Sequence, residues 1–343
     1  MDTSKLVPHD ARVREETAQI RGKTYSYMIG APQNSRQPID TVFLLHGFPD
    51  LNFGWRYQIP HLMSLGFRVV APSMLGYAGT SRPDDLHQWS FKSISDDIKA
   101  LATKFVGEEG QIILGGHDWG GAVAWRVALW HPGLIKAVFS VCTAFQAPAT
   151  RWASLEDHVA AGRLVNFRYQ LQLAGPDVEE RLRSEHHVWQ FLNGMFGGAG
   201  PNGERAFTTW DGVQFDNLPL LGLSPLLSRE EADHYARQYM RQPEPPMRGP
   251  LNWYRTRKIN HEEELELARN FRQVEAPALF IAATKDAALP PAMSAGMEKH
   301  FRDLTRREVE ATHWALVEAS EQVNRGIAEW LNKVLNGAIK ATL

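Results

Sequence analysis

The chain has 343 residues and a formal net charge of −2 at pH 7, with 43% hydrophobic and 22% charged residues. This near-neutral balance gives no electrostatic basis for binding nucleic acid, so no nucleic-acid partner is expected. No apolar run approaches the length of a bilayer-spanning helix, which predicts no stable membrane insertion and, by default, a cytoplasmic location. The length suits one α/β core that carries an insertion.

Short apolar runs bounded by turn residues predict buried strands. In chain order they lie at residues 41–45, 68–71, 111–114, 137–142, 278–283 and, less clearly, 306–310. Apolar residues at helical spacing predict amphipathic helices at 91–105 and 323–335. The alternation of strands and helices favours an α/β fold with a mostly parallel sheet flanked by helices.

A long segment between the fourth and fifth strands has a different character. From about Ala144 to Asn260 the sequence is rich in tryptophan, arginine and glutamine, with loops at 194–203 and 242–250. We interpret this segment as an inserted, mainly helical cap domain at the carboxyl edge of the sheet, where open α/β folds bind ligands. The expected division is core 1–145, cap 146–260 and core 261–343.

The run from Ile112 to Gly121 leads a buried strand into a glycine-flanked turn with Asp118 at its apex. A sharp turn from strand to helix strains its apex residue, and Gly116, Gly120 and Gly121 allow the chains to approach closely. The pattern is similar to the nucleophile elbow of α/β-hydrolases, with aspartate where lipases carry serine. A simpler interpretation is that Asp118 is a helix N-cap residue.

An aspartate nucleophile suits different chemistry from a serine. A carboxylate is already ionised at neutral pH, so it can attack a saturated carbon without a base and form an ester. Epoxides and alkyl halides offer such carbons. Hydrolysis of that ester needs a water molecule, a base that activates the water, and a group that orients the base.

Two downstream residues fit the base and its partner. Asp286 follows the predicted strand 278–283, and His313 follows the candidate strand 306–310. Taken singly, Asp286 could be a turn aspartate and His313 a loop histidine. The order of nucleophile, acid and histidine after successive strands is that of α/β-hydrolases, which favours a catalytic triad of Asp118, Asp286 and His313.

The loop His46–Asp50 closes the first long predicted strand. We expect the backbone N–H of Phe48, together with that of Trp119, to form an oxyanion hole. The simpler interpretation is a tight turn braced by His46. Phe48, Trp119 and Trp314 adjoin the expected catalytic groups and predict an apolar substrate pocket.

Together these residues resemble the soluble epoxide hydrolases of the α/β-hydrolase superfamily, from about Lys23 to Leu335. The family's His-Gly-x-Pro loop matches residues 46–49, and its nucleophile, acid and base fall on the residues named above. The resemblance implies that Tyr169 and Tyr254, in the cap, donate hydrogen bonds to the epoxide oxygen and bind substrate. Thr312 departs from the pattern, because many relatives have glycine before the histidine.

The resemblance implies an enzyme that converts a small apolar epoxide and water to a vicinal diol through an ester on Asp118, without a cofactor. No metal is expected, since His186, His187 and the other histidines lack the spacing of a metal site. A monomer or homodimer is expected. The nearest alternative is a haloalkane dehalogenase, although such enzymes commonly place asparagine where Phe48 stands. A non-catalytic binding protein is a further alternative, and a serine hydrolase is disfavoured because the elbow has no serine.

Overall fold

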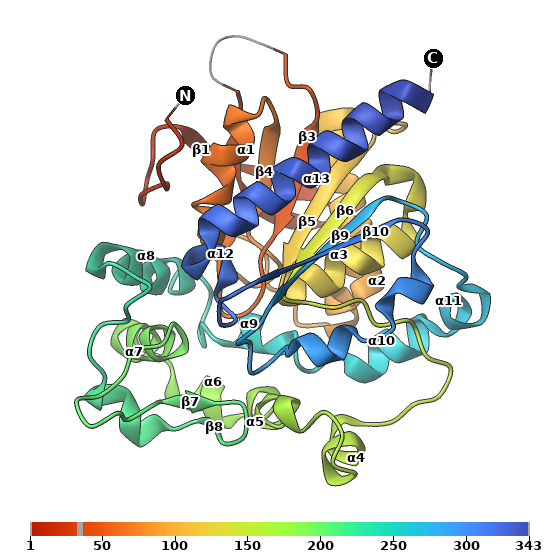
Figure 1. Cartoon of the computed structure of the whole chain (residues 1–343). Helices are drawn as coiled ribbons and strands as arrows, with labels where there is room; N and C mark the ends of the chain where they lie inside the picture. Colours follow the sequence, from red (N-terminus) through yellow and green to blue (C-terminus); the bar gives the residue numbers. More distant parts are fainter. Residues whose placement is uncertain (1, 33–36, 342–343) are drawn as a thin grey trace.

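An eight-stranded sheet forms the centre of the protein. The computed structural model describes residues 2–32 and 37–341 (Figure 1). The strand order is β1-β2-β4-β3-β5-β6-β9-β10. The strands of this sheet are β1 (Val13–Ile20), β2 (Lys23–Gly30), β3 (Thr41–Leu45), β4 (Arg68–Pro72), β5 (Ile112–His117), β6 (Ile135–Val141), β9 (Ala278–Ala283) and β10 (Leu304–Val309).

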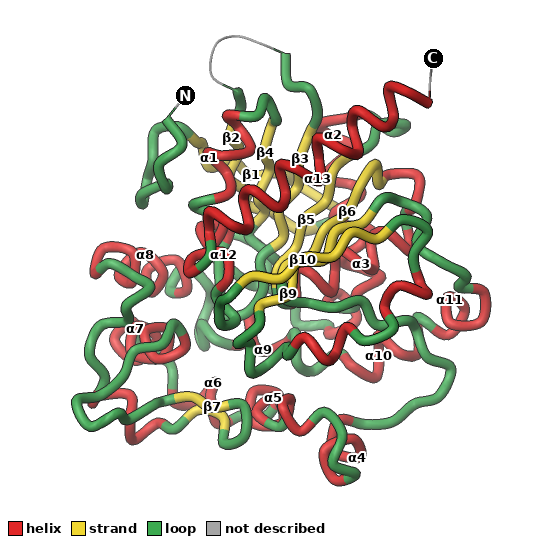
Figure 2. Tube along the Cα trace, viewed as in Figure 1, coloured by secondary structure: helices red, strands yellow, loops and turns green. Residues whose placement is uncertain are grey.

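Helices cover the sheet, and most of the regular secondary structure in the insertion between β6 and β9 is helical (Figure 2). Those of the core are α1 (Gln58–Ser64), α2 (Phe91–Val106), α3 (Trp119–Trp130), α12 (Ala315–Glu318) and α13 (Ser320–Ala341). The insertion contains α4 (Leu155–Ala160), α5 (Tyr169–Ala174), α6 (Asp177–Arg181), α7 (Glu185–Met195), α8 (Arg229–Tyr239), α9 (Arg248–Asn252), α10 (Arg257–Glu263), α11 (Leu265–Asn270) and the short strand pair β7 (Phe207–Thr208) and β8 (Gly212–Val213).

The predicted α/β fold is confirmed. From β4 to β10 all neighbouring strands pair in parallel, while β2 runs antiparallel to both β1 and β4. Strands β3, β5 and β9 are buried along their whole length, as expected for strands covered by helices on both faces. The hairpin β1–β2 was not predicted, because β1 is a largely polar strand at the sheet edge.

Helix α2 illustrates how local sequence sets the helical layer. Ser90 caps its first turn by accepting a hydrogen bond from the Ser93 N–H at 3.1 Å, and Gly107, with φ of 77°, ends it. Between these ends the helix buries Ile94 and Ile98. The apolar face that the sequence predicted therefore packs against the core.

The parallel pairing brings the ends of five strands to one edge. Strands β3, β5, β6, β9 and β10 are consecutive neighbours, and Ala283 of β9 pairs with Val309 of β10. The loops that follow these strands therefore emerge side by side, and the insertion lies below the core, away from the two chain termini (Figure 1). No helix among the described residues is long and apolar enough to cross a bilayer.

The turn between β5 and α3 is packed against backbone on both sides. A Cβ at Gly120 would collide with the carbonyl groups of Leu45 and His46, and a Cβ at Gly116 would collide with Gly120. Neither neighbour is a flexible side chain, so the turn cannot relax around an added methyl group.

We therefore expect Gly120→Ala to lower the free energy of unfolding by about 3 kcal/mol, the upper end for overpacking. Gly133→Ala is the matched control, because Gly133 is exposed and has open space at its Cβ position; its effect should stay within about 1 kcal/mol. Urea denaturation followed by circular dichroism measures both. Equal midpoints for the two variants would contradict the packing argument.

Candidate active site

Asp118 is held in an unusual backbone conformation between β5 and α3. Its φ of 53° and ψ of −125° are strained for a residue with a Cβ. It occupies the N-cap position of α3, but its side chain makes no capping hydrogen bond. Instead, its main-chain oxygen accepts hydrogen bonds from the Gly121 and Ala122 N–H groups and from Thr143 Oγ1. The carboxylate is thus left free to face the cavity.

Backbone amides support the Asp118 carboxylate. The Phe48 N–H donates to Asp118 Oδ1 at 2.6 Å, and the Trp119 N–H also acts on the carboxylate. Burial raises the pKa of Asp118, and His313 and these two amides oppose the rise by stabilising the charged form. The result is a buried but supported carboxylate.

His313 bridges the other two carboxyl groups of the expected triad. Its Nδ1 lies 2.8 Å from Asp286 Oδ2, and its Nε2 lies 3.6 Å from Asp118 Oδ2. Asp286 Oδ1 accepts hydrogen bonds from the N–H groups of Ala288 and Leu289, both at 2.9 Å. These contacts fix Asp286 and orient the ring through it.

The charges of this group are strongly coupled. Burial lowers the pKa of His313, but the Asp286 and Asp118 carboxylates outweigh it and raise that pKa to about 9. Burial raises the pKa of Asp286, but His313 and the backbone donors lower it to about 2. At neutral pH the ring therefore carries a proton while Asp286 is ionised.

His46 braces the loop that carries Phe48. A neutral ring fits its two contacts, since Nδ1 lies 3.0 Å from the Gly47 carbonyl oxygen and Nε2 accepts from the Met74 N–H at 2.9 Å. Burial lowers the pKa of His46 to about 4, which keeps the ring neutral. The bracing role and the position of the Phe48 N–H are therefore compatible.

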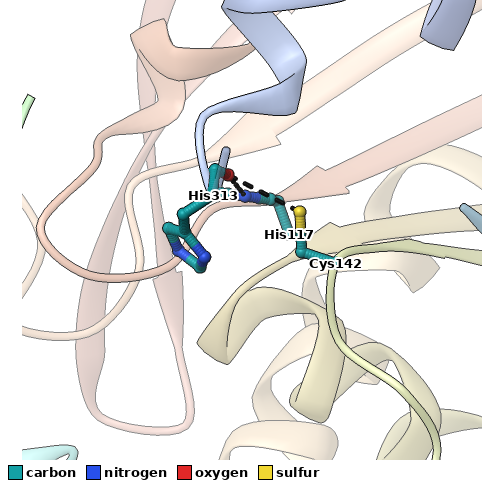
Figure 3. Close-up of side chains that lie close together, drawn as sticks. All are labelled: His117, Cys142 and His313. Atoms are coloured by element: carbon teal, nitrogen blue, oxygen red, sulfur yellow. Dashed lines mark hydrogen bonds between the residues drawn. The ribbon is translucent and has the colours of Figure 1, made fainter. Parts of the chain in front are cut away.

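A second brace acts on the backbone of His313. His117 Nε2 and Cys142 Sγ lie 2.8 and 3.5 Å from the His313 carbonyl oxygen and both donate to it (Figure 3). Ligand atoms of these three residues lie within 4.8 Å of one another. The two donors are committed to a backbone oxygen, which is the arrangement of a loop brace and not of a metal ligand set.

The insertion contributes two tyrosines that line the same cavity as the expected triad. Tyr169 begins α5 and Tyr254 follows α9, and both side chains are buried. Their ring centroids are 6.3 Å apart, and the Tyr254 ring packs edge-on against Phe48 at 5.1 Å and Trp119 at 5.3 Å. Burial raises the pKa of both phenols, so each stays protonated at neutral pH.

Two cavities, of about 300 and 490 Å³, meet at Asp118 and Tyr169, which line both. The walls are largely apolar and aromatic, and Trp314 stacks on Phe196 at 3.8 Å. All of the site residues expected from the sequence line one cavity or the other: Phe48, Asp118, Trp119, Tyr169, Tyr254, Asp286, His313 and Trp314.

Several polar residues at the site were not predicted from the sequence. Gln170 Nε2 donates to Tyr169 Oη at 3.3 Å, and Arg257 Nη2 donates to Gln170 Oε1 at 2.7 Å. Asp50, beside the Phe48 loop, accepts from Tyr235 Oη at 2.6 Å, and burial raises its pKa to about 6. The position of Gln170 directly after a predicted site tyrosine was the only signal available.

Comparisons with known proteins identify the family to which this chain belongs. Residues 40–320 match the alpha/beta hydrolase fold family. The chain is 42% identical to the epoxide hydrolase srdG of Neurospora crassa, over 98% of this chain and 100% of that protein. It is 34% identical to epoxide hydrolase A of Mycobacterium tuberculosis, over 72% of this chain and 76% of that protein.

Among solved structures, an epoxide hydrolase from Vigna radiata superposes with a TM-score of 0.77 and 23% identity, over 95% of this chain and 100% of that chain. This likeness supports the fold. The sequence matches favour epoxide hydrolysis over haloalkane dehalogenation. With an α/β core and a full-length match to a named relative, the chain belongs to the epoxide hydrolases of the α/β-hydrolase fold.

Proposed function

We propose that this epoxide hydrolase works through a covalent ester on Asp118. Its Oδ2 attacks one ring carbon of the epoxide, while Tyr169 and Tyr254 bind the epoxide oxygen. The ring C–O bond breaks, and the developing alkoxide takes a proton from a phenol. The observation that carries this proposal is the carboxylate itself: one oxygen is bound by the Phe48 N–H, and the other faces the cavity and His313.

Water then hydrolyses the ester. His313, oriented by Asp286, takes a proton from the water as its oxygen attacks the ester carbonyl carbon. The oxygen that becomes negative is Oδ1, which the Phe48 N–H binds at 2.6 Å, and the Trp119 N–H, which also acts on this carboxyl group, completes the proposed oxyanion hole. Collapse of this intermediate releases the vicinal diol and restores the carboxylate, so the two steps add one water molecule to the epoxide.

The charge change at Asp118 links the two steps. Before reaction, the Asp118 and Asp286 carboxylates both favour a protonated His313. Formation of the ester removes one of these negative charges, so the pKa of His313 falls. The ring can then give up its proton, which replaces the proton that the phenol transferred to the alkoxide. The neutral ring is then the base that activates the water.

The apolar lining of the cavities supports a small, apolar epoxide as the substrate. We propose that the reaction needs no cofactor. We propose that the helical insertion, with 146–260 as its expected bounds, acts as a cap over the site; residue 260 falls within α10. The proposed compartment is the cytoplasm, which suits a chain with a single, buried free cysteine. A monomer or homodimer remains our prediction.

The first test is to trap the ester. His313→Gln should form it on mixing with styrene oxide but fail to hydrolyse it, so steady-state turnover should fall by roughly a thousandfold or more. Intact-protein mass spectrometry should then record a mass gain of one epoxide, and peptide mapping should place it on Asp118.

The control is Asp118→Asn in the His313→Gln background, which should give no adduct. An adduct that persists in the double variant, or that maps to another residue, would refute the proposed nucleophile. An adduct from a bromoalkane and not from any epoxide would support dehalogenase chemistry instead.

Ester hydrolysis should depend on pH through His313. Because the base must be neutral, the rate constant for ester breakdown should rise with pH and reach a plateau. Its midpoint should lie below the free-enzyme pKa of about 9, since Asp118 is uncharged in the ester. Rapid-quench kinetics across the pH range measures the midpoint, and NMR titration of His313 gives the free-enzyme value. A midpoint equal to or above the free-enzyme pKa would contradict the proposed link.

A further inference from the structure

The two cap tyrosines differ in their polar contacts. Tyr169 Oη accepts a hydrogen bond from Gln170 Nε2 at 3.3 Å, and Gln170 in turn accepts one from Arg257. Tyr254 packs on the rings of Phe48 and Trp119, and its hydroxyl has the neutral Trp119 side chain as a hydrogen-bond partner. Tyr169 therefore lies at the end of a polar chain, Arg257–Gln170–Tyr169, whose members all line the same cavity as Asp118.

The chemistry of Arg257 fixes the direction of every bond in this chain. A guanidinium group has only donors, so the Gln170 atom that faces it at 2.7 Å must be the amide oxygen. The amide NH₂ must then face Tyr169 and donate to its oxygen. Because the phenol oxygen is used as an acceptor here, the phenol proton is free to point in another direction.

We propose that Gln170 and Arg257 are positioning residues that aim the hydroxyl proton of Tyr169 at the epoxide oxygen. Because Gln170 links Tyr169 to the charged Arg257, whereas the partner of the Tyr254 hydroxyl is the neutral Trp119 side chain, Tyr169 becomes the main proton donor of the pair. This inference rests on the proposed role of the tyrosines. It makes Tyr169 the residue that transfers the proton and Tyr254 a residue that binds the epoxide oxygen. The positive charge of Arg257 acts in the same sense, since it stabilises the negative charge that develops on the phenol as its proton leaves.

The same chain also ties together the two segments that carry the tyrosines. Arg257 begins α10, three residues after Tyr254, and its bond to Gln170 holds the beginning of α5. Arg255 holds the other end of α5 through the carbonyl oxygens of Ala174 and Gly175, at 3.0 and 3.1 Å. Both arginines therefore hold α5 in place, and Arg257 also sets the direction of the phenol proton.

Gln170→Glu tests the direction of the proton with little change in shape. The new carboxylate keeps its bond to Arg257 but has no donor for Tyr169, so the phenol donates to it and turns its proton away from the cavity. We expect the rate constant for ester formation to fall roughly ten- to hundredfold, with ester hydrolysis unchanged. Stopped-flow and rapid-quench kinetics separate the two steps.

Arg257→Met should give a smaller loss in the same step, because the amide is then free to rotate. Lys258→Met is its control: this neighbouring side chain is 71% exposed and pairs with the exposed Glu262 at 3.8 Å, so ester formation should be unchanged.

The Tyr169→Phe background separates positioning from a structural effect. If Gln170 acts through the phenol, Gln170→Glu should cause no further loss once the hydroxyl is gone. A full further loss there, or normal ester formation in Gln170→Glu alone, would refute the inference. Normal ester formation in Tyr169→Phe itself would instead refute the proposed role of Tyr169.

Discussion

The active site depends on one strained residue. Asp118 adopts a φ of 53° because β5 must turn at once into α3, and this turn exists only where Gly116 and Gly120 let two backbones touch. A residue in this conformation costs about 1–3 kcal/mol, which the surrounding packing must offset. The strained conformation makes the carboxylate project from the sheet edge, where it meets the Phe48 N–H from the loop after β3 and the His313 ring that follows β10. Each of these partners comes from a different strand, so the parallel sheet, and not any local motif, sets the distances.

Electrostatics explains why two carboxylates and one histidine can share so small a space. Charges in this largely enclosed site would be costly if any were unpaired, but Asp286 is held by His313 and two backbone amides, and Asp118 accepts from the Phe48 N–H. His313 is the common partner. In the mechanism we propose, a change of charge at Asp118 acts directly on the ring, which allows one histidine to be protonated while the ester forms and neutral when water attacks. His117 and His46, whose pKa values burial lowers to about 3 and about 4, stay neutral and act as rigid hydrogen-bonding braces.

The sequence predicted those parts of the structure that local patterns determine. Short apolar runs predicted β3, β5 and β9, and the spacing of the glycines predicted the turn at Asp118. The hairpin β1–β2 was missed because β1 is polar and its turn places Arg21, with φ of 48°, where Asn usually precedes glycine. The partnership of Arg257 with Gln170 could not be predicted either, since it joins side chains 87 positions apart. Such contacts arise from the packing of the cap, for which one sequence offers no periodicity.

The helical insertion is hydrogen-bonded to the same loop that binds Asp118. Tyr235 of α8 donates to Asp50, and Tyr239 donates to the Pro49 carbonyl oxygen at 2.7 Å. Both contacts lie within two residues of Phe48, whose N–H holds the carboxylate. In the mechanism we propose, helices of the insertion therefore act at both ends of the reacting bond: α8 holds the loop that binds Asp118, while α5 and the segment before α10 carry the two phenols that bind the epoxide oxygen. A displacement of the cap would move both sets together, so the alignment of nucleophile, ring carbon and proton donor depends on cap packing as much as on the sheet.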